Sequence, residues 1–436
     1  MRIFASLACA ALLVSCRSTS PAARLDALFT DLHARGLFSG AVVVAERDRI
    51  LFEKGYGEAN IEKHVPYTPD TPTDGASLAK TFTAALILAL EREGVLKLDD
   101  PVQKYLPELP YPGITLRHLI SHSSGIPSPY YEYFDQFLPP GETRTTERLL
   151  EVIAQHKPPL RATPGTAFEY SSFAFDLALL AAARAAGKPY AELLDERFFR
   201  PLGMTSAFLR PARLRDFPGI RTMSYRNGVV DDVFEDEAFH GGSNIYISAR
   251  DLHRWNASLM AQPSPPSARV NDHPSGLNLG SWYSGGDSFW YSGHLQGFHS
   301  VVFRNVRRRL SIVYVSNNTV EPWMQHGVIR AVNAILDGRS DPPAPPAVRR
   351  ITKDDYASLT GEWRMSDGET LLIDRDARHL FITRNGVRYL IVQIDPKAFY
   401  VPGLDFITGF TDDDRLYVST NLGEEVSLPR PHPSNR

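Results

Sequence analysis

The stretch Ser77-Leu-Ala-Lys80 runs directly into Thr81-Phe-Thr-Ala-Ala-Leu-Ile-Leu-Ala-Leu90 and is the strongest signal in the chain. The apolar run predicts a buried helix, and Gly75-Ala76 before it predicts a turn that opens this helix. Residues three apart on a helix share a face, so Ser77 and Lys80 are expected to point the same way. A partly desolvated lysine beside a serine hydroxyl can lose its proton and act as a base. A helix cap followed by a surface lysine is the other interpretation of an isolated Ser-x-x-Lys tetrapeptide.

Further blocks follow this tetrapeptide in a fixed order, and several ordered blocks are more specific than any single motif. They are Gly94–Val102, Tyr105–Pro107, Ile114–Gly125, Pro164–Ser172, Gly187–Tyr190, Pro201–Met204, Gly242 and Ser248–Leu252. Over Leu25–Leu336 the chain resembles the penicillin-recognising serine hydrolases, in particular their class C β-lactamase, DD-peptidase and esterase branch. The resemblance implies an α+β fold, with a β-lactamase-like antiparallel sheet flanked by helices and an inserted helical domain.

The same resemblance assigns the catalytic roles. Ser77 matches the nucleophile of the family, Lys80 matches its basic partner, and Tyr170 matches the phenolic base that relays a proton to the leaving group. A phenol needs a nearby ammonium to become useful as a phenolate near neutral pH. The backbone amides of Ser77 and His294 match the pair that forms the oxyanion hole.

Two positions depart from the family pattern. Ser172 stands where the family has an asparagine, and its shorter side chain puts the orientation of Lys80 and of a substrate carbonyl in question. Tyr291-Ser292-Gly293 stands where the family has Lys or His, then Ser or Thr, then Gly. Without that cation or imidazole, we expect the site to be less suited to substrates that carry a carboxylate. The His294 ring is either a substitute imidazole or a surface histidine, because strand alternation points it away from the Tyr291 face.

The N-terminus explains both cysteines of the chain, Cys9 and Cys16. A basic start and the apolar run Ile3–Val14 predict a secretory signal, too short to span a bilayer as a mature helix. Leu13-Val14-Ser15-Cys16 resembles the bacterial lipobox, which implies a signal peptide over 1–15, lipid attachment at Cys16 and a tether over 16–24. A plain signal peptide cut nearby is the alternative. Both interpretations export the protein, and the first makes it a cell-envelope lipoprotein that contacts the membrane through its lipid.

Apolar runs near both ends of the hydrolase-like part, expected over 25–340, predict elements that share one sheet. They are a helix over Leu25–Leu37, a hairpin of Gly40–Ala45 with Ile50–Phe52, a hairpin of Val301–Phe303 with Leu310–Val315, and a closing helix over Val328–Leu336. The arginines between the two strands of the second hairpin, Arg304 and Arg307–Arg309, are expected to form a solvated turn.

A proline-rich linker over 341–350 separates this part from residues 351–436, where the sequence pattern changes. Short β-rich runs alternate there with turn signals, which predicts a small antiparallel all-β domain. The runs are Leu371–Ile373, Leu380–Thr383, Tyr389–Val392, Phe399–Val401, Phe406–Thr408 and Leu416–Val418.

The charge balance and the pattern of possible metal ligands limit the classes of partner that the protein could bind. The 47 lysines and arginines are balanced by 50 acidic residues, so no basic excess is available to neutralise a nucleic acid. Beyond Cys16 the chain has no cysteine. His118 and His122 are four apart on a predicted helix, the spacing of zinc ligands, but no glutamate lies between them. We therefore expect no metal and no cofactor.

These patterns together predict an exported serine hydrolase of the β-lactamase type. It would cleave an ester, an amide or a β-lactam in a small-molecule or peptide-like substrate, through an acyl-enzyme on Ser77. The substitutions at Ser172 and Tyr291 leave a second hypothesis, a catalytically silent binding or regulatory protein that kept the fold.

Overall fold

The computed structural model describes residues 20–429, except 48, 127–135, 140, 168–169, 214–216, 218, 220, 227–228, 231–236, 262–281, 284–286, 296, 319–322, 340–348, 367, 377–379, 385, 396–397, 402–405 and 420–423. The expected signal peptide, Cys16 and most of the expected linker therefore lie outside the described residues.

A six-stranded antiparallel sheet forms the centre of the hydrolase part. Its order is β12 (Trp282–Tyr283), β13 (Ser288–Leu295), β14 (Phe298–Asn305), β15 (Leu310–Ser316), β1 (Gly40–Glu46) and β2 (Arg49–Tyr56). Strand β1 pairs with β15, from Gly40 opposite Ser316 to Glu46 opposite Leu310. Both predicted hairpins are thus confirmed, and so is their union in one sheet.

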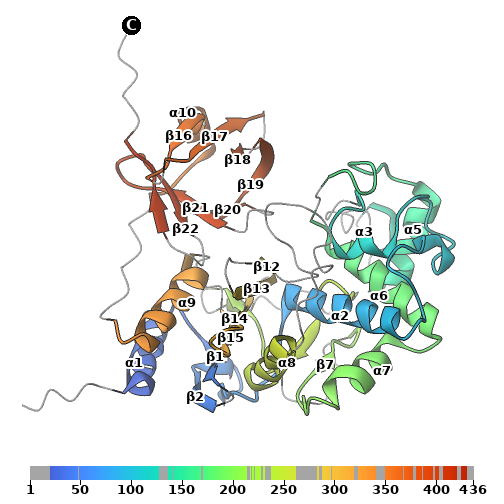
Figure 1. The fold of residues 1–436 in the computed structure, drawn as a ribbon, viewed down its shortest axis with the longest axis horizontal. Coiled ribbons are helices and arrows are strands. Elements are labelled where there is room, and N and C mark those ends of the chain that lie inside the picture. The colour runs from blue at the N-terminus through green and yellow to red at the C-terminus, as the bar shows by residue number, and fades with distance from the viewer. Residues whose placement is uncertain are drawn as a thin grey trace, which may run out of the picture.

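Helices cover both faces of this sheet, which explains why β1 is buried over its whole apolar run rather than at alternate residues. Helices α1 (Pro21–Ala34) and α9 (Trp323–Leu336) pack together on one side, and α8 (Ala249–Ala261) packs on the other (Figure 1). The predicted terminal helices are confirmed, with somewhat different ends.

The remaining helices gather beside the sheet, between β2 and β13 in the sequence (Figure 1). They are α2 (Ala79–Arg92), α3 (Leu116–Ile120), α5 (Thr146–His156), α6 (Ser172–Ala186) and α7 (Tyr190–Leu194), with the short turns η1 (Ala76–Leu78), η2 (Val102–Lys104) and η4 (Asp195–Phe199). Helix α2 is buried along most of its length, and Phe82 stacks on Trp255 of α8 at 4.1 Å. This contact fixes α2 against the layer behind the sheet.

Short strands connect the helices to the sheet. In a three-stranded sheet, β11 (Ile245–Ile247) pairs with β7 (Phe208–Leu209) and with β5 (Thr73–Asp74), which lies just before the 77–80 motif. Asp74 is opposite Tyr246, 172 residues further along the chain. Smaller pairs are β3 (Glu58–Asn60) with β4 (Val65–Pro66), β6 (Arg144–Thr145) with β10 (Glu237–Ala238), and β8 (Tyr225–Arg226) with β9 (Val229–Val230).

The expected solvated arginine turn is wrong for Arg304. This residue belongs to β14, is 6% exposed, and lies 5.0 Å from the ring centre of Phe289 on the paired strand. Burial lowers the pKa of its guanidinium to about 10. Arg308 in the turn binds Glu46 and Asp337. The run of charges gave no sign that its first member lies on a strand face covered by α8.

The C-terminal residues form a separate eight-stranded antiparallel sheet in chain order (Figure 1). Its strands are β16 (Gly361–Arg364), β17 (Thr370–Arg375), β18 (Leu380–Arg384), β19 (Val387–Asp395), β20 (Ala398–Val401), β21 (Phe406–Phe410), β22 (Leu416–Ser419) and β23 (Glu424–Val426), preceded by η7 (Lys353–Asp355) and α10 (Tyr356–Leu359). All six predicted strands are present, and β16 and β23 were missed. Trp363 and Phe410 pack in an apolar core that is distinct from the core of residues 25–335.

Candidate active site

Ser77 lies in η1, the tight turn that opens α2, and is half-buried. The residue before it, Ala76, has φ +48°, a left-handed conformation that is unfavourable for a side chain with a Cβ. The Ala76 N–H donates to Oδ1 of the buried Asp74 at 2.8 Å, and Ser300 Oγ of β14 donates to the Gly75 carbonyl at 2.7 Å. These bonds hold the strained turn and present Ser77 at the helix N-terminus.

Lys80 is fully buried one turn further along α2, and three acceptors surround its Nζ. Nζ lies 3.1 Å from Ser77 Oγ, 3.0 Å from Ser172 Oγ and 2.7 Å from the carbonyl oxygen of Gly242. The interpretation of Lys80 as a surface lysine is therefore excluded. A protonated amine has three N–H groups, and this arrangement offers one partner for each.

Tyr170 is the second side chain, after Lys80, that contacts Ser77 Oγ. Its hydroxyl donates to Ser77 Oγ at 3.0 Å, and Lys80 Nζ lies 5.0 Å from the centre of its ring. Burial by itself would raise the pKa of Tyr170, but the positive charge of Lys80 and the hydrogen bonds from Lys80, Ser77 and Tyr291 outweigh it and lower that pKa below 10. The phenolate thus becomes easier to form where it could accept a proton from Ser77.

His122 packs under this tyrosine. The two rings stack at 4.3 Å, and Nδ1 of His122 accepts the Ser171 N–H at 3.0 Å. Burial, and then the nearby Lys80 charge, lower the pKa of His122 well below 6.5, so the ring is neutral. Helix α3 ends at Ile120 and His122 has φ +55°, which corrects the expectation that His118 and His122 share one helix.

Ser172, the residue in place of the family asparagine, is the first residue of α6. Ser171 caps this helix by accepting the Ala174 N–H, which turns Ser172 toward Lys80. The structure therefore brings Ser77, Lys80, Tyr170 and Ser172 together, although about 90 residues separate the two pairs in sequence.

Strand β13 forms the opposite wall. Gly293 approaches the serine turn so closely that a Cβ there would lie 2.2 Å from the Gly75 carbonyl oxygen and 2.8 Å from the Ser77 nitrogen. Tyr291 is 1% exposed, and a hydrogen bond from its hydroxyl helps to lower the pKa of Tyr170. His294 is exposed, and Ser292 is half-buried. The His294 ring thus lies away from the face that holds Tyr291, in agreement with the expected strand alternation.

The role of Gly242 and Asp176 was missed. The Gly242 carbonyl is the shortest contact of Lys80, and the Gly242 N–H donates to Oδ1 of the buried Asp176 at 2.7 Å. The available signal was an aspartate within the otherwise apolar Phe173–Ala182, because a carboxylate is rarely buried in a helix without a partner.

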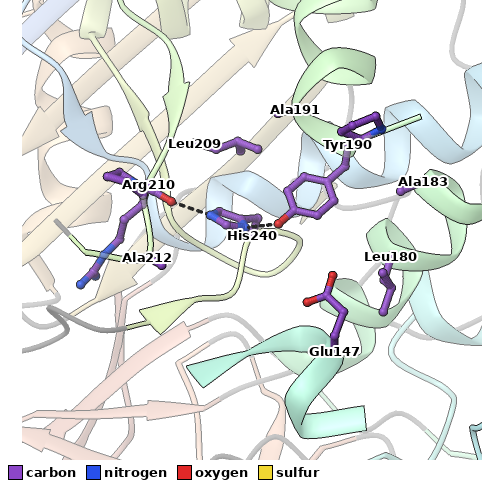
Figure 2. A pocket seen from close by; sticks show the side chains of 11 residues that line it. Glu147, Leu180, Ala183, Tyr190, Ala191, Leu209, Arg210, Ala212 and His240 are labelled. Carbon is purple, nitrogen blue, oxygen red and sulfur yellow. Dashed lines mark hydrogen bonds between the residues drawn. The ribbon is translucent and has the colours of Figure 1, made fainter. Parts of the chain in front are cut away.

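A pocket of about 480 Å³ lies beside this site, between α6, the start of α7 and the end of β7 (Figure 2). Its walls are mostly apolar, and Tyr190, His240 and Glu147 supply polar groups. Ser77, Lys80 and Tyr170 do not line it, so it is not the candidate active site.

Within the described part of the chain, no three His, Cys, Asp or Glu side chains gather as metal ligands would. No helix there has the length and apolar character needed to cross a bilayer. The ring nitrogens Nδ1 of His118 and His122 accept the backbone N–H groups of Thr115 and Ser171.

The fold and this arrangement of Ser77, Lys80 and Tyr170 are of the β-lactamase type. The sequence matches the family described as Beta-lactamase over residues 25–336, so the chain belongs to that family. It is 25% identical to "Penicillin-binding protein 4*" of Bacillus subtilis (strain 168), over 92% of this chain and 96% of that protein.

A second relative supports this assignment, and a solved structure is similar in fold. The chain is 30% identical to "D-alanyl-D-alanine-carboxypeptidase/endopeptidase AmpH" of Escherichia coli (strain K12), over 58% of this chain and 67% of that protein. The fold is similar to the octameric penicillin-binding protein homologue from Pyrococcus abyssi, with a TM-score of 0.59, 19% identity and coverage of 92% of this chain and 99% of that one.

Proposed function

We propose that this protein hydrolyses a carboxylic ester or amide through an acyl-enzyme on Ser77. The observation that carries the proposal is the meeting of two acid–base groups on one nucleophile, with Lys80 Nζ at 3.1 Å and the Tyr170 hydroxyl at 3.0 Å from Ser77 Oγ. This arrangement buries a lysine, which costs free energy of folding, and a catalytically silent protein would gain nothing in return.

In the first half of the reaction, Ser77 Oγ attacks the carbonyl carbon and its proton passes to the Tyr170–Lys80 pair. The lowered pKa of Tyr170 supports its part as acceptor. The oxyanion then faces the Ser77 N–H and a second amide on β13, for which His294 is the family position. The pair returns the proton to the leaving group, and the C–O or C–N bond breaks.

In the second half, water attacks the acyl-enzyme and gives up a proton to the same pair. The tetrahedral intermediate collapses and breaks the bond between the acyl carbon and Ser77 Oγ, the pair returns its proton to Ser77 Oγ, and the acid leaves. No cofactor is required by these steps.

Tyr291 favours neutral substrates over carboxylated ones. It supplies one hydroxyl where the family pattern has a cation or an imidazole, and it is buried against the catalytic tyrosine. We therefore place neutral esters and amides ahead of penicillins and of the peptide carboxylates that the name of the Escherichia coli relative implies.

The decisive experiment is acyl-enzyme trapping by intact-mass spectrometry. Wild type and Ser77→Ala are treated with a fluorophosphonate probe, p-nitrophenyl esters, D-amino-acid amides and a chromogenic cephalosporin. We expect one adduct and ester turnover for wild type and neither for Ser77→Ala, with unchanged circular dichroism because alanine is tolerated at a helix start. Failure of the wild type to label, under conditions that label a related hydrolase, would favour the silent protein.

We further propose that the protein is an exported lipoprotein anchored at Cys16 on the periplasmic side of a bacterial membrane. The lipobox-like Leu13-Val14-Ser15-Cys16 supports this proposal. Expression with radiolabelled palmitate should label wild type in the membrane fraction. Cys16→Ala should be unlabelled, and labelling of that variant would contradict lipidation at this residue.

A further inference from the structure

Gly242 connects two buried charged residues through the two ends of its backbone. Its carbonyl accepts a 2.7 Å hydrogen bond from Lys80 Nζ, and its N–H donates a 2.7 Å hydrogen bond to Oδ1 of Asp176. Lys80 is 0% and Asp176 1% exposed. The glycine backbone is thus held between the base and a carboxylate.

The carbonyl end has a consequence for proton transfer. A carbonyl oxygen can only accept, so it always takes one N–H of Lys80, whereas the hydroxyls of Ser77 and Ser172 can donate or accept. A neutral amine has two N–H groups and one lone pair. With one N–H on Gly242 and the other on Ser172, the lone pair points to Ser77 Oγ, where a general base is needed.

The turn that carries this carbonyl is held on both sides. Both ring nitrogens of His240 are engaged, Nδ1 with the Tyr190 hydroxyl at 2.8 Å and Nε2 with the Arg210 carbonyl at 2.7 Å (Figure 2). The Gly241 carbonyl accepts from Thr83 Oγ1 at 2.9 Å, one turn beyond Lys80 on α2.

Close packing requires glycine in this turn. A Cβ on Gly242 would lie 2.6 Å from the Ser172 carbonyl oxygen, and a Cβ on Gly241 would lie 2.1 Å from that of Phe175. The turn therefore lies directly against the first turn of α6. Asp176 stands one helical turn after Ser172, so both residues face Gly242 from the same side of α6.

We propose that Asp176 is a positioning residue for Lys80, which acts by fixing the Gly242 peptide so that its carbonyl orients the lysine lone pair toward Ser77. Ser172 is shorter than the asparagine of the family pattern and makes a single contact to Lys80. The Gly242 carbonyl makes the shorter contact, 2.7 Å against 3.0 Å, and can only accept, so it has the larger share in orienting the amine. This inference rests on the proposed function, in which Lys80 serves Ser77.

The test measures acylation of Ser77 by a p-nitrophenyl ester in stopped flow, normalised to the active fraction by burst titration. Asp176→Ala should slow acylation 10- to 100-fold with KM within threefold of wild type. Asp176→Asn keeps an oxygen that can accept the Gly242 N–H, and should stay within threefold of wild type. Equal losses for both variants would overturn the hydrogen-bond role and indicate a need for the charge.

A matched control is Asp251, another buried aspartate that accepts a backbone N–H, that of Ser206 at 2.7 Å, at the start of α8. Asp251→Ala should lower stability and leave the normalised acylation rate unchanged. If Asp176→Ala does not fold, Gly242→Ala displaces the same peptide and should show the same slow acylation. A wild-type acylation rate in Asp176→Ala would overturn this inference and leave the proposed function standing. If that variant does not fold, the same holds for a wild-type rate in Gly242→Ala. A wild type that forms no adduct would refute the proposed function, and the inference with it.

Discussion

The hydroxyl of Tyr170 donates to Oγ of Ser77 at 3.0 Å although 93 residues separate the two in sequence. The bond places a phenol of lowered pKa on the nucleophile, at the same oxygen that Lys80 Nζ contacts at 3.1 Å. Two acid–base groups in contact with one nucleophile allow one of them to take up a proton and the other to deliver a proton to the leaving group. Several expected outcomes follow from this pair and its surroundings.

Tyr170→Phe should lower kcat 100- to 10,000-fold, about the range for loss of a general base. Because the pKa of Tyr170 is lowered from 10, rising pH deprotonates it earlier than a free phenol, and kcat/KM should rise with pH on a limb below pH 10. The variant should lose that limb. A pH–rate series on a neutral ester measures this.

The control for this variant is Tyr56→Phe, which removes a buried hydroxyl that donates to Asp26 at 2.7 Å, beyond the central sheet from Ser77. It should retain turnover. If Tyr170→Phe kept wild-type rates with the same pH limb, the phenol would have no part in proton transfer.

Tyr291→His or Tyr291→Lys should shift specificity toward carboxylated substrates. A charge-assisted hydrogen bond to a substrate carboxylate contributes about 1.5–3 kcal/mol, or about one to two decades in kcat/KM. The measurement compares a cephalosporin with a neutral ester of similar size.

His294→Ala is the companion variant, because the exposed His294 ring lies on the other side of β13 from Tyr291. It should leave the ratio between the two substrates unchanged. Faster turnover of the cephalosporin than of the ester by wild type, with no change in His294→Ala, would contradict the assignment of specificity to Tyr291.

Stability should fall in mild acid because of His122. Its folded pKa lies well below 6.5, so below pH 6.5 the unfolded chain binds a proton that the folded chain does not. The free energy of unfolding therefore decreases as the pH falls from 6.5 toward the folded pKa, by at most about 1.4 kcal/mol per pH unit for this group. Urea unfolding between pH 7.5 and 5 gives the slope.

The comparison is with His122→Asn, whose Oδ1 can take the place of Nδ1 as acceptor of the Ser171 N–H. It should flatten the slope in part, since burial also lowers the pKa of His240 and acts in the same direction. Parallel curves for wild type and variant would show that His122 is not the source.

Truncation after Ala347 should leave a folded hydrolase that still acts on small esters, because the C-terminal sheet has its own apolar core. We expect residues 351–436 to affect access of larger substrates, which a comparison of kcat/KM for a short ester and a long acyl substrate would measure. A folded but inactive truncated protein would show that the tail contributes to the chemistry.

Local patterns were enough to predict part of this molecule. The spacing of Ser77 and Lys80 predicted their contact, because residues three apart on a helix are neighbours whatever the rest of the chain does. Alternation and turn residues predicted six of the eight C-terminal strands for the same reason. The family resemblance, rather than spacing, pointed to Tyr170.

Tertiary packing decided the rest. The contacts of Lys80 with Ser172 and with Gly242, 92 and 162 residues away, exist only because α6 and the Gly241–Gly242 turn pack against α2. Burial of Arg304 was likewise set by the helix that covers β14, and a charged side chain carries no mark of this in its sequence neighbours. Local sequence sets which residues are neighbours along a helix or strand. The packing of these elements determined which polar groups left water together, and so which of them could act on Ser77.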